Sequence, residues 1–305
     1  MRIALTTLTL SLIGLSSASA GAGGHDHLPA YAEEIFHAGP FIVTNSMLMV
    51  WIVAIFIIAC AQLATRKMAM IPQGLQNFAE WLVESLYDFL EGILGKDLVK
   101  KTFWFFGSIF ILILLTNWFG LIPGVGTFGW ALTGPGVEAH DKFRPFLRGG
   151  NADLNMTIAM SLTFAVLWFY WAIRENGLGG FFAHIFAPKG TFNGIMKVMM
   201  FLVFGFVGVL ELISIAFRPV ALSFRLYGNI FAGENILENM MLLVGKYEWL
   251  AWLPPLPFYF LEILVGLVQA LVYTMLTAVF LRLICEHDDH GHGHDEENSI
   301  HKKAH

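Results

Sequence analysis

Charged residues are scarce in this sequence. Asp, Glu, Lys and Arg make up only 13% of its 305 residues, whereas hydrophobic residues make up 56%. Soluble domains carry about 25% charged residues, so a chain this poor in charge is predicted to lie in a membrane. The formal net charge of −5 includes no excess of basic residues, which argues against a nucleic-acid partner.

Cysteine is nearly absent as well. The two cysteines, Cys60 and Cys285, fall in or beside apolar segments, so a disulfide framework is not indicated. The sequence has no internal repeat, and it has no glycine-rich loop followed by Lys and Ser or Thr that could cradle nucleotide phosphates. We therefore expect neither a nucleotide site nor a cofactor in this chain.

The two ends of the chain differ from its middle. Residues 1–20 combine a positive Arg2, an apolar run and a closing Ala-Ser-Ala, which predicts a cleaved secretory signal; an uncleaved anchor is the alternative. Residues 21–40 are mixed in composition and are predicted to form a flexible extracytoplasmic segment. Residues 286–305 are predicted to be a disordered, cytoplasmic tail. A weak metal site is the alternative for the tail, through His287, His290, His292 and His294.

Residues 41–285 are predicted to form one all-α membrane domain. Five apolar segments are long enough to cross a hydrocarbon core of ~30 Å; they are residues 41–63, 103–121, 154–173, 194–245 and 258–284. As a helix, the fourth segment would reach ~75 Å, far more than one perpendicular crossing needs. It must be broken, strongly tilted or made of two helices in tandem, and we expect the last two helices to be long and tilted.

A further segment, residues 73–91, is amphipathic and too charged to span. Its apolar residues recur at helical spacing, and its acidic residues take the opposite face. The apolar residues are Leu75, Phe78, Leu82, Leu86 and Phe89, and the acidic ones are Glu80, Glu84, Asp88 and Glu91. We predict an interfacial helix that lies on the membrane surface or against a partner.

Basic residues indicate the orientation of the spans. Arg66 and Lys67 follow the first span and Arg174 follows the third, which places these ends in the cytoplasm by the positive-inside rule. The Gly- and Pro-rich loop at 122–151 then lies outside the cytoplasm. An odd number of spans puts the N-terminus outside and the C-terminus inside, in agreement with the secretory signal. The combination predicts a multi-pass protein of a bacterial inner membrane.

Ionisable residues occur where the sequence is most apolar. Glu211, Arg218 and Arg225 recur every seven residues, which places them on nearly one helix face; Asn229 joins that face, and Glu234 follows. A charge at membrane depth costs roughly 2.5–3.5 kcal/mol, so each such residue is a functional hypothesis by default. For Arg218, snorkelling toward the membrane surface is the alternative.

The last apolar segment carries a second polar pair. Glu262 and Gln269 are also seven residues apart and share one helix face. A carboxyl group can carry a proton, whereas an amide can only hold and orient water. In the second segment, Thr116 and Asn117 are placed to hydrogen-bond between helices.

Four stretches of the chain resemble subunit a of the rotary F-type ATP synthase of bacteria. The signature helix of that family is matched by RPVALSFRLYGNIFAGE, and the last helix by PFYFLEILVGLVQALVYTMLTAVFL. Two further matches are LLTNWFGLIPG and ADLNMTIAMSL. The resemblance covers residues 42–282, and the agreement of four motifs in order makes it specific.

The resemblance implies a proton-translocating stator subunit. Such a subunit forms two aqueous half-channels against a ring of c subunits and couples proton flow to ring rotation and ATP synthesis. Arg225 would face the ring carboxylate, and Glu211 would belong to the cytoplasmic exit. The half-channel through which protons enter would contain Asn229, Glu234, Glu262 and Gln269. The ATP-forming site would lie on another subunit.

The family also implies partners and shows where this chain departs. The expected partners are the c-ring, the peripheral-stalk subunit b, the rest of the complex and the lipid bilayer. Many members lack a secretory signal. Some members carry His at one of the two acidic positions, where this chain has Glu234 and Glu262.

Two other classes of protein would carry ionisable residues in a membrane. A proton-coupled secondary transporter typically shows inverted repeats and paired broken helices, and the sequence shows neither. A metal transporter would explain the histidine-rich ends, but no predicted span contains histidine. A neighbouring gene for a short two-helix protein with one buried carboxylate would favour the synthase over both.

Overall fold

The computed structural model describes residues 32, 34–38, 41–66, 68–125, 129–131, 143–186, 195–242 and 253–285. Within these ranges the chain forms six α-helices, one short 3-10 helix and two β-hairpins. The helices are α2 (Asn45–Thr65), α3 (Leu75–Leu94), α4 (Lys96–Gly120), α5 (Leu154–Phe186), α6 (Ile195–Leu242) and α7 (Pro255–Cys285), and the 3-10 helix is η2 (Gly150–Ala152). The antiparallel hairpins pair β1 (Glu34–Ala38) with β2 (Phe41–Thr44), and β3 (Gly129–Ala131) with β4 (Phe143–Pro145).

Five of the described helices are long and apolar enough to cross a membrane. The candidate spans are Asn45–Thr65, Lys96–Gly120, Leu154–Gly177, Leu202–Met241 and Pro255–Cys285. This confirms the predicted all-α membrane class with five hydrophobic units. The predicted signal at 1–20 and the histidine-rich tail at 286–305 lie outside the described residues.

The chain enters its first span differently from the prediction. Residues 34–38, part of the segment predicted to be flexible, form β1 and pair with β2. The helix therefore begins at Asn45 rather than at residue 41. Thr44 caps it, because its Oγ1 accepts a hydrogen bond from the backbone N–H of Met47 at 3.4 Å.

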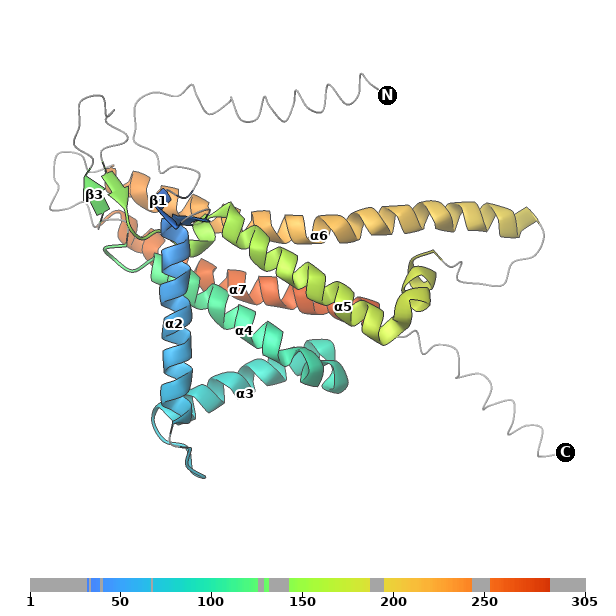
Figure 1. Cartoon of the computed structure of the whole chain (residues 1–305), viewed down its shortest axis with the longest axis horizontal. Coiled ribbons are helices and arrows are strands. Elements are labelled where there is room, and N and C mark those ends of the chain that lie inside the picture. Colours follow the sequence, from blue (N-terminus) through green and yellow to red (C-terminus); the bar gives the residue numbers. More distant parts are fainter. Residues whose placement is uncertain are drawn as a thin grey trace, which may run out of the picture.

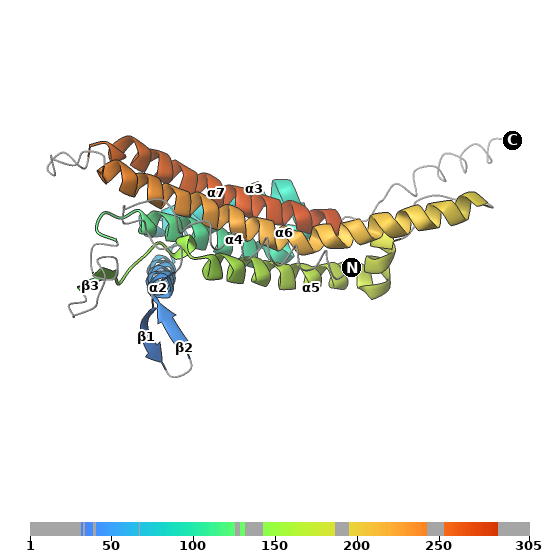
Figure 2. The same ribbon diagram turned by 90° about the horizontal axis from the view of Figure 1, so that it is seen from above.

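The long fourth segment is one unbroken helix. α6 runs for 48 residues with Pro219 inside it. Pro219 has no backbone N–H to donate. One turn later, the Ser223 hydroxyl donates to the Pro219 carbonyl at 2.8 Å. Figure 1 shows α6 and α7 running at a steep angle to α2. Figure 2, turned by 90°, shows α6 and α7 side by side, and this confirms the pair of long C-terminal helices.

The third span ends at a turn inside α5. The helix changes direction at Gly177, whose φ of +69° lies in the left-handed region that glycine adopts readily. This turn comes three residues after Arg174, close to the predicted end of the span at residue 173.

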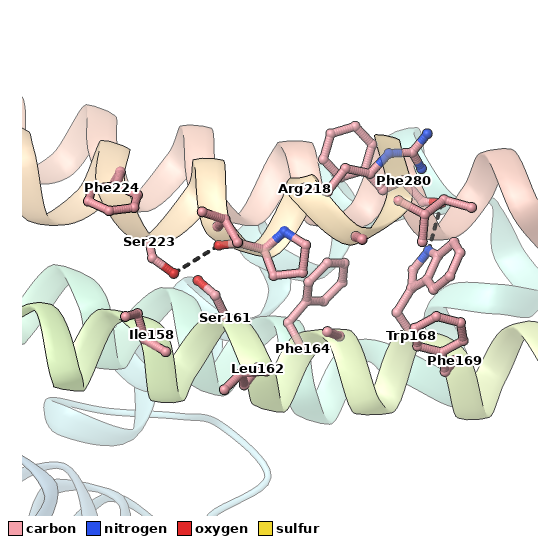
Figure 3. A pocket seen from close by; sticks show the side chains of 15 residues that line it. Ile158, Ser161, Leu162, Phe164, Trp168, Phe169, Arg218, Ser223, Phe224 and Phe280 are labelled. Carbon is pink, nitrogen blue, oxygen red and sulfur yellow. Dashed lines mark hydrogen bonds between the residues drawn. The ribbon is translucent and has the colours of Figure 1, made fainter. Parts of the chain in front are cut away.

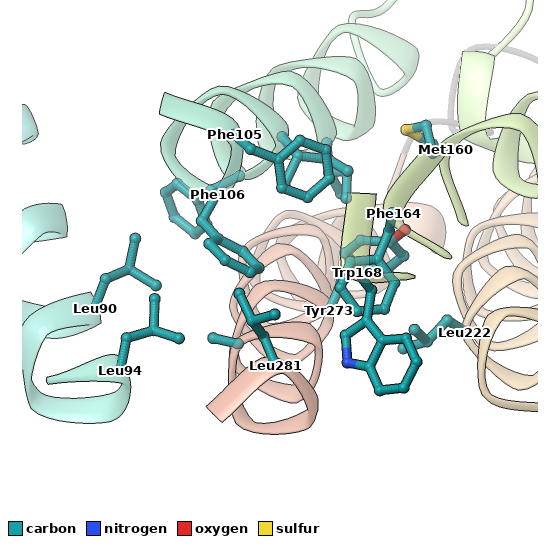
Figure 4. Packing of buried hydrophobic residues seen from close by; sticks show 14 of the residues in the cluster. Leu90, Leu94, Phe105, Phe106, Met160, Phe164, Trp168, Leu222, Tyr273 and Leu281 are labelled. Atoms are coloured by element: carbon teal, nitrogen blue, oxygen red, sulfur yellow. The ribbon is translucent and has the colours of Figure 1, made fainter. Parts of the chain in front are cut away.

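Aromatic side chains fill the core between α4, α5 and α7. Figure 4 shows Phe105 of α4, Phe164 and Trp168 of α5 and Tyr273 of α7 around this core. The rings of Phe105 and Phe164 are stacked with their centroids 6.4 Å apart. The Tyr273 hydroxyl lies 3.3 Å from the Ser161 hydroxyl, so the buried phenol oxygen is hydrogen-bonded.

The amphipathic segment is confirmed as a helix, and only part of its apolar face is buried within the chain. In α3 the buried leucines are Leu86, Leu90 and Leu94, and α3 packs against α4 and α7. Phe78 and Phe89 of the predicted apolar face are exposed within this chain. The contact with α4 and α7 involves the C-terminal half of the helix, so burial follows that half and not the whole apolar stripe.

Candidate functional site

Arg225 points away from the helix bundle. On α6, Leu222, Leu226 and Ile230 are buried, whereas Arg225 between them is exposed. Among the described residues, Arg225 makes no hydrogen bond and no ion pair. A permanent positive charge thus lies on the outer face of a candidate membrane span.

An amide pair joins the last two helices about one turn beyond Arg225. Asn229 Nδ2 of α6 donates to Gln269 Oε1 of α7 at 2.7 Å. Gln269 is only 4% exposed, and its Nε2 has no hydrogen-bond partner among the described residues. A buried amide N–H of this kind needs a hydrogen-bond partner, a role that an ordered water molecule can fill in proteins.

Glu234 and Glu262 line one small cavity. Its volume is about 10 Å³, which admits about one water molecule, and its wall includes Thr116 and Asn117. Glu262 is 5% exposed, and its Oε1 has no hydrogen-bond partner among the described residues. A Cβ on Gly233 would overlap the Glu262 carboxyl, so glycine at this position makes room for that group against α6.

The structure adds a cation that the sequence analysis missed. Arg148, between β4 and η2, is 5% exposed, and its Nε lies 3.7 Å from Glu234 Oε2. Its guanidinium also lies 6.0 Å from the centroid of the Phe231 ring. Arg148 falls in a loop without helical periodicity, so no pattern distinguished it from other loop charges. The nearest signal was the ADLN motif that follows it in the chain.

The loop segment 148–150 lies inside the helix bundle, and we call it the wedge. Gly149 and Gly150 are buried, and a Cβ on Gly150 would come within 2.5 Å of Val50 Cγ2. A Cβ on Gly149 would overlap the Glu234 carboxyl. The two glycines therefore let irregular backbone approach α2 and α6 closely, and they hold Arg148 at the cavity.

Buried hydrogen bonds fix this wedge in place. Asn151 Nδ2 donates to Asn117 Oδ1 at 2.6 Å, and Asn117 Nδ2 donates to the Gly266 carbonyl of α7 at 3.1 Å. The Ser46 hydroxyl of α2 donates to Asp153 Oδ2 at 2.6 Å. Asn117 thus joins helices as the sequence predicted, and it also anchors the loop.

Glu211 and Arg218 form a separate pair. Arg218 Nη2 donates to Glu211 Oε1 at 2.8 Å, and its guanidinium lies 4.7 Å from the centroid of the Phe280 ring. Arg225, predicted on the same face, takes no part in this pair. Arg218 is thus held by an anion and an aromatic ring of its own chain.

A larger cavity beside this pair is apolar. It measures about 380 Å³ and lies between α5 and α6, with Phe280 of α7 in its wall. Figure 3 shows Ile158 and Phe164 on one side and Phe224 on the other, with Arg218 toward one end. Among the described residues that line it, Arg218 alone is charged and none carries a carboxyl group for proton exchange. Within the described part of the chain, no three His, Cys, Asp or Glu residues cluster as metal ligands.

These features define a multi-pass helical membrane protein with carboxyl groups inside its bundle and an outward-facing arginine on one span. The family model described as ATP synthase A chain matches residues 47–282. The chain therefore belongs to the ATP synthase subunit a family, as its four motifs indicated.

Individual relatives agree with that assignment. ATP synthase subunit a of Moorella thermoacetica is 32% identical over 254 residues, which cover 81% of this chain and 94% of the relative. The subunit a of Gloeobacter violaceus is 30% identical over 254 residues, covering 83% and 89%. That of Solidesulfovibrio magneticus is 29% identical over 258 residues, covering 84% and 89%.

Proposed function

We propose that this chain is the proton-translocating stator subunit of an ATP synthase and forms two aqueous half-channels against a ring of c subunits. Membership of the family supports a place in the membrane part of that complex. The observation that carries the finer proposal is Arg225, an exposed cation on a spanning helix without a partner among the described residues. A charge held at membrane depth needs a partner, and here that partner is a carboxylate of another chain.

The surface of α6 suits such a partner. Only 11% of the most apolar 18-residue stretch of α6 is buried within the chain, compared with 39% of the corresponding stretch of α7. Large apolar side chains of α6 outside the α5–α6 cavity are exposed, among them Phe217 and Ile236. The helices of a c-ring would cover this face. Subunit b, the other subunits of the complex and the bilayer would cover the remaining apolar surface.

Arg225 acts as a fixed charge in the proposed mechanism. Arginine keeps its proton in proteins, so it cannot carry one. A ring carboxyl that comes within ~4–6 Å is stabilised in its ionised form and releases its proton. It passes Arg225 and is protonated again on the other side. Each charge that crosses gains about 2.3 kcal/mol per 100 mV of membrane potential, which drives rotation.

Polar groups of α6 and α7 form the half-channel through which protons enter. Glu234 and Glu262 can exchange protons, whereas Asn229 and Gln269 can hold and orient water. Their positions support this reading, because the carboxyl pair shares a cavity and the amide pair bridges α6 and α7. Glu211 serves the cytoplasmic exit.

We further propose the orientation and location of the chain. The N-terminus lies outside the cytoplasm of a bacterium, the C-terminus lies inside, and the spans cross the inner membrane. Residues 1–20 act as a secretory signal and residues 286–305 as a solvated tail. ATP is made on another subunit, to which this chain is coupled through the ring.

Purification tests the function directly. The full chain, tagged and extracted from its native membrane in mild detergent, is expected to bring with it a soluble ATPase and a ring of small two-helix subunits. Vesicles containing this complex should take up protons when ATP is added. A secondary transporter would purify without these subunits and would transport without them, and that result would contradict the proposal.

Gly233 offers a test of the Glu262 position. Gly233→Ala adds a methyl group where the Glu262 carboxyl lies, so we expect proton flux through the assembled complex to fall by ~10- to 100-fold as that carboxyl is displaced. The matched control is Gly228→Ala on the same helix, where a Cβ meets nothing within 4 Å. Equal flux in the two variants would show that the position of Glu262 is unimportant.

A further inference from the structure

Arg148 is the cation that lies against the carboxyl pair. Its side chain is 6% exposed, and that of Glu234 is 17% exposed. Lys and Arg are almost never buried without a partner, so Arg148 and Glu234 are best understood as one charge-compensated unit. The unit is held by the wedge of Gly149 and Gly150 and not by a regular element.

The charges around Glu234 come from four sides. Arg148 is contributed by the wedge and Glu262 by α7, while Glu238 and the Tyr227 phenol lie on α6 itself. Asp153 follows η2 and is engaged by Ser46. α4 contributes only uncharged groups to the cavity, Thr116 and Asn117. Arg148 is therefore the one cation within this set of described residues.

The two carboxyl groups have different surroundings. Glu234 has a guanidinium 3.7 Å away, which stabilises a carboxylate. Glu262 makes no ion pair among the described residues, and its Oε1 has no hydrogen-bond partner there. It faces the same cavity, and Gln269 follows it two turns later on α7 with an unsatisfied Nε2.

We propose that Arg148 is a positioning residue that holds Glu234 as a permanent counter-ion, and that Glu262 is the carboxyl group that carries the proton. This inference rests on the proposed function. Two neighbouring carboxylates in a water-poor site repel each other, so a fixed cation on one of them separates their roles.

The resulting proton transfer has few steps. A hydronium ion reaches the cavity, one of its O–H bonds breaks to leave water, and a new O–H bond forms on the Glu262 carboxylate. Glu262 then gives its proton to water held at Asn229 and Gln269, and from there it passes to a ring carboxylate. Only protons move, and Glu234 remains charged throughout.

A double-variant cycle tests the assignment. Proton flux is measured under an imposed potential in vesicles that hold the assembled complex with the soluble ATPase removed. Arg148→Gln leaves a carboxylate without its cation, and Glu234→Gln leaves a cation without its carboxylate. We expect each to lower flux by at least ~10-fold, because breaking a buried pair is more damaging than removing it. Arg148→Gln combined with Glu234→Gln should conduct at least ~10-fold better than either alone.

Two additional variants separate a charge effect from a packing effect. Arg148→Lys keeps the cation and should conduct better than Arg148→Gln. The pH profile of flux should gain a second step in Arg148→Gln, where two carboxyl groups titrate, and should lose it again in the double variant. A residue that only packs the loop would change the amount of complex and not the shape of this profile.

The double variant decides the result even where a single variant fails to assemble. Flux in the double variant that disappears on adding Glu262→Gln supports the proposal. The proposal would be overturned if Arg148→Gln combined with Glu234→Gln gave a flux no more than ~2-fold above that of Glu234→Gln alone. Glu234 itself would then carry the proton. Failure of the proposed function is distinct, because the unaltered complex would then show no such flux.

Discussion

Replacing Arg225 by alanine is expected to abolish ATP-driven proton pumping in a complex that still assembles. The residue is exposed on α6 and makes no hydrogen bond or ion pair with the described residues, so its loss should not disturb the fold. Without the charge, nothing forces a ring carboxyl to ionise as it passes. Arg225→Lys should also abolish pumping, because lysine lacks the planar fork and can lose its proton when buried.

The two Arg225 variants should differ in passive leak. With the soluble ATPase removed and a potential imposed, alanine should let protons slip between the half-channels, whereas lysine should leak less because it keeps a charge part of the time. Arg66→Ala, which removes an exposed arginine at the end of α2, is the control and should pump normally. Pumping by Arg225→Ala would show that α6 is not the stator face.

Glu262→Gln is expected to reduce proton flux by ~100-fold or more, a typical effect of losing a positioned proton-transfer group. Glutamine nearly matches glutamate in shape but cannot carry a proton, so the complex should assemble in normal amounts. Glu84→Gln provides a matched control, because Glu84 lies exposed on α3. Unaltered flux in Glu262→Gln vesicles would remove this residue from the pathway.

The spans could be predicted because apolar length is a property of the sequence alone. The pairing of polar residues was less predictable. Glu211, Arg218 and Arg225 share a seven-residue period, yet only the first two meet. A period of seven drifts by ~20° per repeat on a straight helix, and the neighbouring helices decide which members turn inward. The roles of these residues in proton transfer stay predictions.

Arg148 could not be predicted from a local pattern. Its position depends on two glycines that let a loop enter the bundle, and on contacts with Val50, Asn117 and Glu234 from three different helices. Sequence reasoning treats a loop as surface, because buried irregular backbone leaves polar groups to satisfy. Here Asn45 of α2 donates to the Pro145 carbonyl at 3.3 Å, and the Ala152 N–H donates to the Gly149 carbonyl at 3.1 Å. The bond from α2 depends on the tertiary arrangement.

The unbroken course of α6 has a mechanical consequence. In the proposed complex, a ring that turns against this helix would push it sideways, and a helix broken at Pro219 would bend at that point. α6 instead continues as one helix of 48 residues that packs against both α5 and α7. A sideways force at Arg225 would therefore be spread along these neighbours, which would limit changes in the distance between the arginine and a passing ring carboxylate.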